Sequence, residues 1–245
     1  MVVRVCGCMG VVCFHPYTHT PKHPYNMKYL ITFEKGESVR WLGHLDILRT
    51  FERAIRRAEL PIAFSTGFNP RERIAFASAL STGVTGAAEL ATIEFTEPVD
   101  PPFIVNSLNE KLPPGIRLHS AQEIPDVGSR DLLNSYDRAE IQVVCACSPE
   151  TTIETAQSAA AALLLRTQIS IEREREGKVK KVDIRPLIHS VDAIEMSGDR
   201  ITFRMILALG TEGTAKPAEI VGILAQELPG LAVRRVHRLR LICDE

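Results

Sequence analysis

The sequence lacks the features that would assign it at once to a membrane, fibrous or nucleic-acid-binding class. Its 245 residues contain no apolar run of 18 or more, so no membrane-spanning helix is expected. The 29 Lys and Arg are matched by 30 Asp and Glu, which leaves a net charge of −1. An overall basic charge is therefore absent, and only a local basic patch could hold a nucleic acid.

Cysteine and catalytic motifs are also scarce or missing. Six cysteines in a chain of this length exclude a small disulfide-bonded scaffold, and we expect a reduced, cytoplasmic protein. The patterns GxGxxG, GxxxxGK[ST], HExxH and GxSxG do not occur. The sequence therefore predicts no cofactor and favours a protein that is not an enzyme.

The first 26 residues differ in composition from the rest of the chain. They contain Cys6, Cys8 and Cys13 together with three of the seven histidines. Thiolates and imidazoles bind zinc, but the spacing C-x-C-x4-C-x-H matches no zinc-site pattern, so no metal site is expected. A glycine-broken apolar run without an A-x-A-like cleavage site is also a poor signal peptide. We interpret residues 1–26 as a disordered extension or a mis-called start, with translation beginning at Met27.

Residues 27–124 show the order β-α-β-β-α-β. Apolar and polar residues alternate in its expected strands, whereas in the longer helix apolar residues recur every three or four positions. The expected elements are a strand at 28–33, a helix at 43–59, extended pieces at 62–66 and 73–79, a strand at 89–95, a helix at 101–112 and a strand at 116–121.

Residues 136–245 repeat this order after a polar, turn-rich segment at 124–135, which we interpret as a linker. We therefore predict an α+β fold of two tandem ferredoxin-like (βαββαβ) halves with antiparallel sheets. The second half would contain a strand at 140–147, a helix from a Ser148 cap to about Arg166, a hairpin turning near Gly177, a strand at 201–209, a helix at 217–228 and a strand at 231–242.

Charge is most concentrated between residues 40 and 73, where seven arginines against four acids leave a local charge of +3. Arginine presents a planar fork that matches phosphate. One interpretation is a surface that follows a phosphate backbone, and the other is a solvated helix face with a Glu52–Arg56 pair. The arginines expected on the helix face opposite Leu48 and Phe51 are Arg49, Arg53, Arg56 and Arg57.

The turn after this helix carries an aromatic residue between basic ones. Phe68 and Asn69 lie beside Arg71 and Arg73. An exposed Phe68 would suit stacking on a nucleic-acid base. The alternative, which we favour slightly, is that Phe68 packs into the core at the end of the sheet.

Two residues at the start of the same helix are candidates for a separate role. Asp46 in the first turn is explained by the helix dipole. His44 could serve as a general acid or base, or as a capping or packing residue.

The second half contributes two further groups. Asp183 and Arg185 are expected on one strand face, where they would form a structural ion pair. In the closing strand, alternation predicts one face with Arg234, Arg238 and Arg240 and the other with Arg235 and His237. If the halves face each other, the first set would line one groove with the 40–73 cluster.

Two runs, W-L-G-H-L-D-x3-R-x2-E-R-A-x-R-R-A-x-L-P at 41–61 and S-x-G-F-N-P-x-x-R at 65–73, resemble the radical SAM-linked protein family. The resemblance recurs at V-D-I-R-P (182–186) and in the loop around 213–217, and it spans Met27 to about Arg240. By motif match the residues that carry over are His44, Asp46, Arg49, Glu52, Arg53, Arg57, Phe68, Asn69, Arg73, Asp183 and Arg185. Gly43, Glu72 and Ala75 replace the usual Ser, Pro and Ser.

This resemblance implies a partner and no reaction. Members of the family resemble accessory domains fused to, or encoded beside, cobalamin-binding radical SAM proteins, and their function is uncharacterised. The chain shows no cluster-binding cysteine triad and no cobalamin motif. Any radical chemistry would therefore be supplied by a separate protein.

Three functions follow from these observations. The first is a non-catalytic accessory module that binds RNA for a radical SAM partner. The second is a protein–protein adaptor that docks on that partner, and the third is a metal-independent RNA endonuclease that uses His44. The oligomeric state stays open. For the first function the binding residues would be Arg49, Arg53, Arg56, Arg57, Phe68, Asn69, Arg71, Arg73, Arg234, Arg238 and Arg240.

Overall fold

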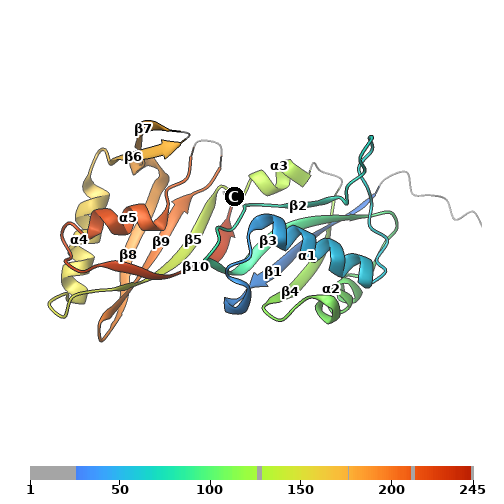
Figure 1. The fold of residues 1–245 in the computed structure, drawn as a ribbon, viewed down its shortest axis with the longest axis horizontal. Helices are drawn as coiled ribbons and strands as arrows, with labels where there is room; N and C mark the ends of the chain where they lie inside the picture. Colours follow the sequence, from blue (N-terminus) through green and yellow to red (C-terminus); the bar gives the residue numbers. More distant parts are fainter. Residues whose placement is uncertain (1–25, 126–128, 176, 211–212, 244–245) are drawn as a thin grey trace, which may run out of the picture.

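The computed structural model describes residues 26–125, 129–175, 177–210 and 213–243. The fold is mixed α+β, built on a mostly antiparallel sheet that runs along the long axis (Figure 1). Cys6, Cys8 and Cys13, and with them the interpretation of residues 1–26, lie outside the part that the structure describes. Within the described part, no helix is long and apolar enough to cross a membrane.

The first half begins with a strand whose inward side chains are Tyr29, Ile31 and Phe33, as its alternation predicts. Helices α1 and α2 cover these side chains and close one hydrophobic core. The elements are β1 (Met27–Lys35), η1 (Glu37–Val39), α1 (His44–Arg57), β2 (Ile74–Phe76), β3 (Thr85–Phe95), α2 (Pro101–Lys111) and β4 (Ile116–Ile124).

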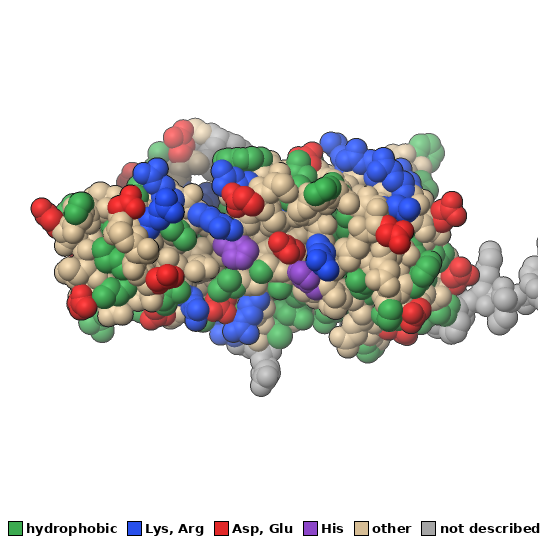
Figure 2. All heavy atoms as spheres, turned by 90° about the horizontal axis from the view of Figure 1, so that it is seen from below, with side chains coloured by type: hydrophobic (Ala, Val, Ile, Leu, Met, Phe, Trp, Pro, Cys, Tyr) green, Lys and Arg blue, Asp and Glu red, His purple; other side chains and the backbone are tan. Residues whose placement is uncertain are grey.

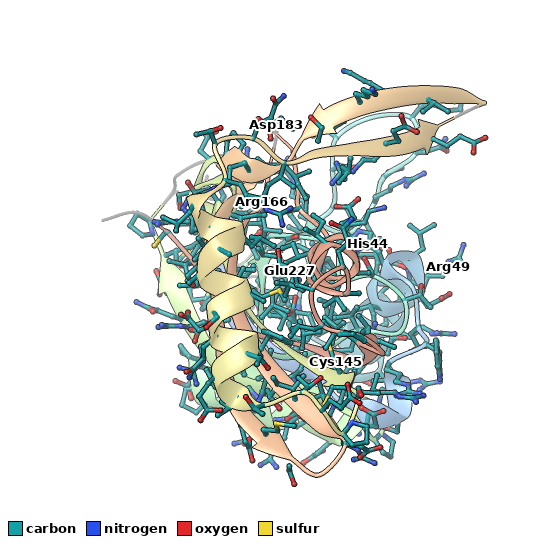
Figure 3. The ribbon with its side chains drawn as sticks, turned by 90° about the vertical axis from the view of Figure 1, so that its left-hand side faces the viewer. His44, Arg49, Cys145, Arg166, Asp183 and Glu227 are labelled. Atoms are coloured by element: carbon teal, nitrogen blue, oxygen red, sulfur yellow. The ribbon has the colours of Figure 1, made fainter. Side chains whose placement is uncertain are left out.

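The second half has its own core, closed by helices α4 and α5. A hairpin, β6–β7, forms a separate two-stranded sheet that projects from this half (Figures 1 and 3). The elements are α3 (Ser129–Asn134), β5 (Arg138–Ala146), α4 (Ile153–Leu165), β6 (Ser170–Arg175), β7 (Lys178–Asp183), η2 (Arg185–Leu187), β8 (Ile188–Ser197), β9 (Arg200–Ala208), α5 (Pro217–Leu224) and β10 (Ala232–Ile242).

The strands of both halves join in one sheet, in the order β4-β1-β3-β10-β5-β9-β8, with β2 paired to β3. The order within the first half is β4-β1-β3-β2, and within the second half it is β10-β5-β9-β8. In both cases the last strand of the half lies beside the first, and every pairing within a half is antiparallel. The parallel pairing of β3 with β10 joins the halves.

Three local expectations were wrong. The segment expected as a linker contains helix α3, whose Leu133 is buried and which packs beside β2 and β3. Helix α4 starts from Thr152, whose hydroxyl accepts from the backbone N–H of Thr155, and not from Ser148. Strand β8 was missed because two bulges break the alternation on which strand prediction depends.

The junction between the halves combines a short backbone pairing with a buried ion pair. Strands β3 and β10 pair only at Thr85–His237 and Gly86–Arg238. Beside this pairing Arg238 binds Glu89 through both Nε, at 2.8 Å, and a terminal nitrogen, and each side chain is only 5% exposed. The same guanidinium also donates to the backbone oxygen of Ser78 at 3.0 Å. The paired charges hold the two halves together.

Alternation had predicted that Arg238 shares an exposed face with Arg234 and Arg240. This prediction was wrong, because Arg238 is buried. Strand β10 carries two register shifts, between Val233 and Arg235 and between Arg238 and Arg240. Each shift inserts one residue and moves the residues after it to the other side of the strand. As a result, Arg238 faces inward while Arg240 stays exposed.

Lys35 is the third charge buried at the junction. It is 1% exposed, and its ammonium donates to the backbone oxygen of Leu42 at 2.9 Å. Burial lowers the pKa of Lys35; the negative charge of Glu89 opposes this shift and Arg238 adds to it. Glu89 thus lies between two buried cations.

We expect Arg238→Ala to lower the free energy of unfolding by about 3–5 kcal/mol, because it leaves Glu89 buried without its partner. Urea unfolding followed by circular dichroism measures the change. Arg240→Ala is the control: its side chain is 66% exposed, and its loss should cost less than about 1 kcal/mol. Equal effects of the two substitutions would contradict the central role of the buried pair.

Cysteine reactivity offers a second test of the fold. Cys145 is fully buried, and burial raises the pKa of its thiol to about 12. Cys243 is exposed. Peptide mass spectrometry after iodoacetamide treatment of the native protein at pH 8 should therefore find Cys243 alkylated and Cys145 unmodified. Alkylation of both at similar rates would show that the second core is open.

Candidate nucleic-acid interface

Helix α1 presents an arginine-rich face to solvent. Its buried side is formed by Ile47, Phe51, Ala54 and Ile55. Arg49, Arg53, Arg56 and Arg57 are all exposed, as the helical spacing predicts. Figure 3 shows Arg49 extending away from the body of the molecule, and Figure 2 shows a row of basic side chains over α1.

The four arginines differ in whether their guanidinium groups already have hydrogen-bond or ion-pair partners in the protein. Arg56 is paired with Glu72, and Nε of Arg53 donates to the backbone oxygen of Arg49 at 3.1 Å. Among the described residues, Arg49 and Arg57 have no hydrogen-bond or ion-pair partner for their guanidinium groups. Both cations are therefore free to bind an anion.

Residues 61–73 form a narrow finger beside this helix. Its two arms are joined by backbone hydrogen bonds from Ser65 to Arg71 and from Arg73 to Ala63. At the tip, Gly67 has φ +142°, a conformation that favours glycine. The Arg56–Glu72 ion pair connects the finger to α1, so helix face and finger form one surface.

Phe68 lies at the tip of the finger and is fully exposed. The expectation that it packs into the core was wrong, because the finger carries its tip beyond the end of the sheet. Asn69 and Arg71 are exposed beside it. Arg73 is half-buried and binds Glu94 at 2.9 Å, so it stabilises the base of the finger.

His44 and Asp46 lie in the first turn of α1, in different roles. The Asp46 carboxylate accepts from the backbone N–H of Gly43 at 3.1 Å and thereby caps the helix. The exposed His44 ring packs edge-on against Phe76, with centroids 5.4 Å apart. The cavity beside it, which Lys35 and Glu89 also line, has a volume of about 20 Å³.

Asp183 and Arg185 are structural, but they do not form the predicted ion pair. Asp183, at the base of the β6–β7 hairpin, accepts from the backbone N–H groups of Ile169 and Arg185. The guanidinium of Arg185 donates to three backbone carbonyls, those of Leu164, Arg166 and Ile188. They brace the hairpin base and lie away from α1.

Arg234 and Arg240 are exposed on β10, and neither has a hydrogen bond or ion pair with the described residues of α1 or the finger. Arg240 binds Glu140 at 2.7 Å, and Arg204 approaches the same carboxylate at 3.5 Å. Arg234 lines a separate cavity with Arg200 and Arg235. Arg200, Arg204 and Lys35 were missed, since each is placed by a strand pairing that single-sequence patterns do not reveal.

A larger cavity, of about 520 Å³, lies where the end of β2 meets the second half. Ser78 contributes from the first half, and Tyr136, Asp137 and His189 from the second. Pro186 and Gly213, from the two motif segments of the second half, also line it. Within the described part of the chain, no three His, Cys, Asp or Glu residues are placed to hold a metal ion.

Residues 28–217 match a family described as an uncharacterised protein conserved in bacteria, DUF2344. The chain belongs to the DUF2344 family. The match includes α1 and the finger and ends at the first residue of α5. It does not link DUF2344 to radical SAM proteins, and no curated protein matches the chain.

Among solved structures, this DUF2344 chain is similar to one of a Cbf5-Nop10-Gar1 complex, with a TM-score of 0.53 and 10% identity. It is also similar to one of an H/ACA RNP bound to a substrate RNA containing 2'-deoxyuridine, with a TM-score of 0.50 and 12% identity. Each alignment covers 87% of this chain but only 48% or 47% of the other. The DUF2344 chain thus spans about half the length of the chains it matches, and the likeness shows the fold alone.

We expect Phe68→Ala to change the unfolding free energy of this DUF2344 protein by less than about 0.5 kcal/mol, because its ring contacts only solvent. Phe51→Ala, by contrast, should cost about 3–5 kcal/mol, since Phe51 is fully buried in the first core. Urea unfolding of both variants measures the difference. A large loss of stability on Phe68→Ala would mean that the finger packs against the body.

Proposed function

We propose that the protein is a non-catalytic module that binds RNA through the exposed face of α1 and the finger. The observation that carries this proposal is a row of exposed arginines, of which Arg49 and Arg57 have free guanidinium groups, leading to a fully exposed Phe68. Guanidinium groups bind phosphates, and an exposed aromatic ring stacks on unpaired bases. Both chemistries lie on one continuous surface.

Local charge supports this assignment in a chain whose net charge is −1. Like charges on adjacent turns of α1 oppose helix formation slightly, so the row is not explained by helix stability. Arg71 extends the positive charge to the finger and has no partner for its guanidinium among the described residues. A polyanion binding here would neutralise the repulsion.

The structural likeness supports the same assignment indirectly. One of the similar structures is described as an RNP bound to a substrate RNA. We further propose that each half, 27–124 and 136–245, is a ferredoxin-like unit. The support is the repeated strand order, β4-β1-β3-β2 and β10-β5-β9-β8, with a separate core in each half.

The radical SAM protein remains the proposed partner, on the motif resemblance alone. A protein adaptor is the second candidate function, and one observation favours it. Trp41 and Leu45, beside the start of α1, are 66% and 61% exposed. Large exposed apolar side chains are common at protein interfaces. The nuclease gains no such support, because the contact that the structure shows for the His44 ring is edge-on packing against Phe76.

We expect the double variant Arg53→Glu/Arg57→Glu to weaken RNA binding by at least tenfold at 50 mM salt. The slope of log K against log salt should also become less negative by about 1.4, because two phosphate contacts to a single strand are lost. Fluorescence anisotropy with a labelled single-stranded RNA across a salt series measures both quantities. Phe68→Ala should weaken binding by about 1–3 kcal/mol without changing the slope.

The matched control is Lys111→Glu/Arg117→Glu, which makes the same charge change at two exposed residues, at the end of α2 and on β4. The control should keep nearly the affinity of the unchanged protein. If both double variants lose the same RNA affinity, the loss reflects net charge and not a site on α1, and the proposal is overturned. If the unchanged protein does not bind RNA, the proposal is also overturned and the adaptor is favoured.

A further inference from the structure

A second basic site lies on the side of β5 and β10 opposite the core of the second half. On this side Gln142, Val144, Arg235 and His237 line a cavity of about 150 Å³. A larger cavity, of about 400 Å³, adjoins it and shares Val144 and Arg235. Its other lining residues are Ala146, Asp199, Arg200 and Arg234. The two cavities form one groove, here called the β10 groove.

Strand β10 brings two consecutive arginines to this groove through an irregularity in its backbone. Val233 pairs with Cys145 and Arg235 with Val144, so Arg234 is the extra residue of a bulge. In a regular strand, Arg234 and Arg235 would point to opposite sides of the sheet. Bulges commonly redirect a side chain next to a functional site.

The arginines of the groove have donors that no other group satisfies. Arg235 lies 3.6 Å from Glu37, and Arg200 lies 3.9 Å from Asp199, both beyond hydrogen-bond distance. Arg234 has no ion pair or side-chain hydrogen bond with any described residue. Since each guanidinium carries five N–H donors, the groove has a large unmet capacity for an oxygen-rich anion.

Arginines elsewhere in the fold show the contrast. Arg238 donates to Glu89 and to Ser78, Arg185 to three carbonyls, and Arg173 to both oxygens of Glu219. Each of these guanidinium groups makes three or more hydrogen bonds, and each side chain has a structural role. The three arginines of the β10 groove are partly exposed and unsaturated, which is the state expected before a ligand binds.

The floor of the groove is also polar. Thr85 Oγ1 and His237 Nδ1 lie 2.7 Å apart and share a hydrogen bond between the two halves. Burial, with a further contribution from Arg235, lowers the pKa of His237 against the opposing charges of nearby glutamates, which favours the neutral ring. Positive charge in the groove therefore comes from the arginines.

We propose that the β10 groove binds a phosphate group through Arg200, Arg234 and Arg235. Three guanidinium groups against two carboxylates, those of Asp199 and Glu37, leave the groove with the net positive charge that favours a phosphate. The phosphate could belong to a nucleic-acid backbone or to a free phosphorylated ligand. The residues of the β10 groove belong neither to α1 nor to the finger, so the groove is independent of the proposed RNA surface.

The test uses the full chain and two probes, inorganic pyrophosphate and a single-stranded RNA. Binding of each is measured by isothermal titration calorimetry at 50 mM salt for the unchanged protein and for Arg234→Gln/Arg235→Gln. The matched control is Lys111→Gln/Arg117→Gln, which also removes two exposed positive charges. Circular dichroism checks that all variants stay folded.

We expect Arg234→Gln/Arg235→Gln to lower the affinity for at least one probe tenfold or more. The control should change the affinity for either probe by no more than twofold. Loss of pyrophosphate binding assigns the groove to a free phosphorylated ligand. Loss of RNA binding alone assigns it to a nucleic-acid backbone. If neither probe responds, or if the control loses as much, the proposal is overturned.

These outcomes are separable from those for α1. The Arg53→Glu/Arg57→Glu variant leaves the β10 groove intact, so it should still bind any pyrophosphate that the unchanged protein binds. If the Arg234→Gln/Arg235→Gln variant loses binding but the α1 variant does not, the β10 groove proposal stands and the proposed function of α1 is overturned. If only the α1 variant loses binding, the proposed function stands and the groove proposal is overturned.

Discussion

The buried ion pair between Arg238 and Glu89 is the interaction on which the arrangement of the whole molecule depends. Each half has its own core, but their sheets share only two backbone pairings. Apolar contacts of Ala77 and Leu90 with the second core and the Thr85–His237 hydrogen bond add to the junction, but without the pair Glu89 would be a buried charge that lacks its main partner. A buried pair of this kind adds little over well-packed apolar residues, but it specifies one relative placement of its partners.

The arginines of this chain divide into two groups by how fully their donors are used. The first group, which includes Arg185 and Arg238, makes three or more hydrogen bonds per guanidinium and holds the hairpin base and the junction in place. The second group lies on α1 and in the β10 groove, where Arg49, Arg57 and Arg234 have no partner for their guanidinium groups among the described residues. Composition alone cannot separate the groups, because both count equally toward a net charge of −1. The candidate binding surfaces emerge only when each guanidinium is followed to its partners.

The sequence revealed much of the first half because its signals are local. The exposed arginine face of α1 follows from helical spacing, and β1 follows from strict alternation. Features set by strand pairing were not accessible in this way. The bulges of β8 and β10 shift the pattern by one residue, so β8 was missed and Arg238 was placed on the wrong face. Phe68 was misjudged because an exposed ring at a fingertip violates the usual rule that large apolar residues are buried.

The parallel pairing of β3 and β10 has a consequence for how the chain is made. Glu89 and Arg238 are 149 positions apart, and β10 follows every other strand in the sequence. A nascent chain that has completed its first half therefore exposes Lys35, Glu89 and the start of β3 until β10 is synthesised. Such an unpaired edge is prone to wrong association during this interval. Lys35 and Glu89 make this unpaired edge more hydrophilic than an apolar edge would be. Glu89 also favours pairing with β10, the strand that carries Arg238.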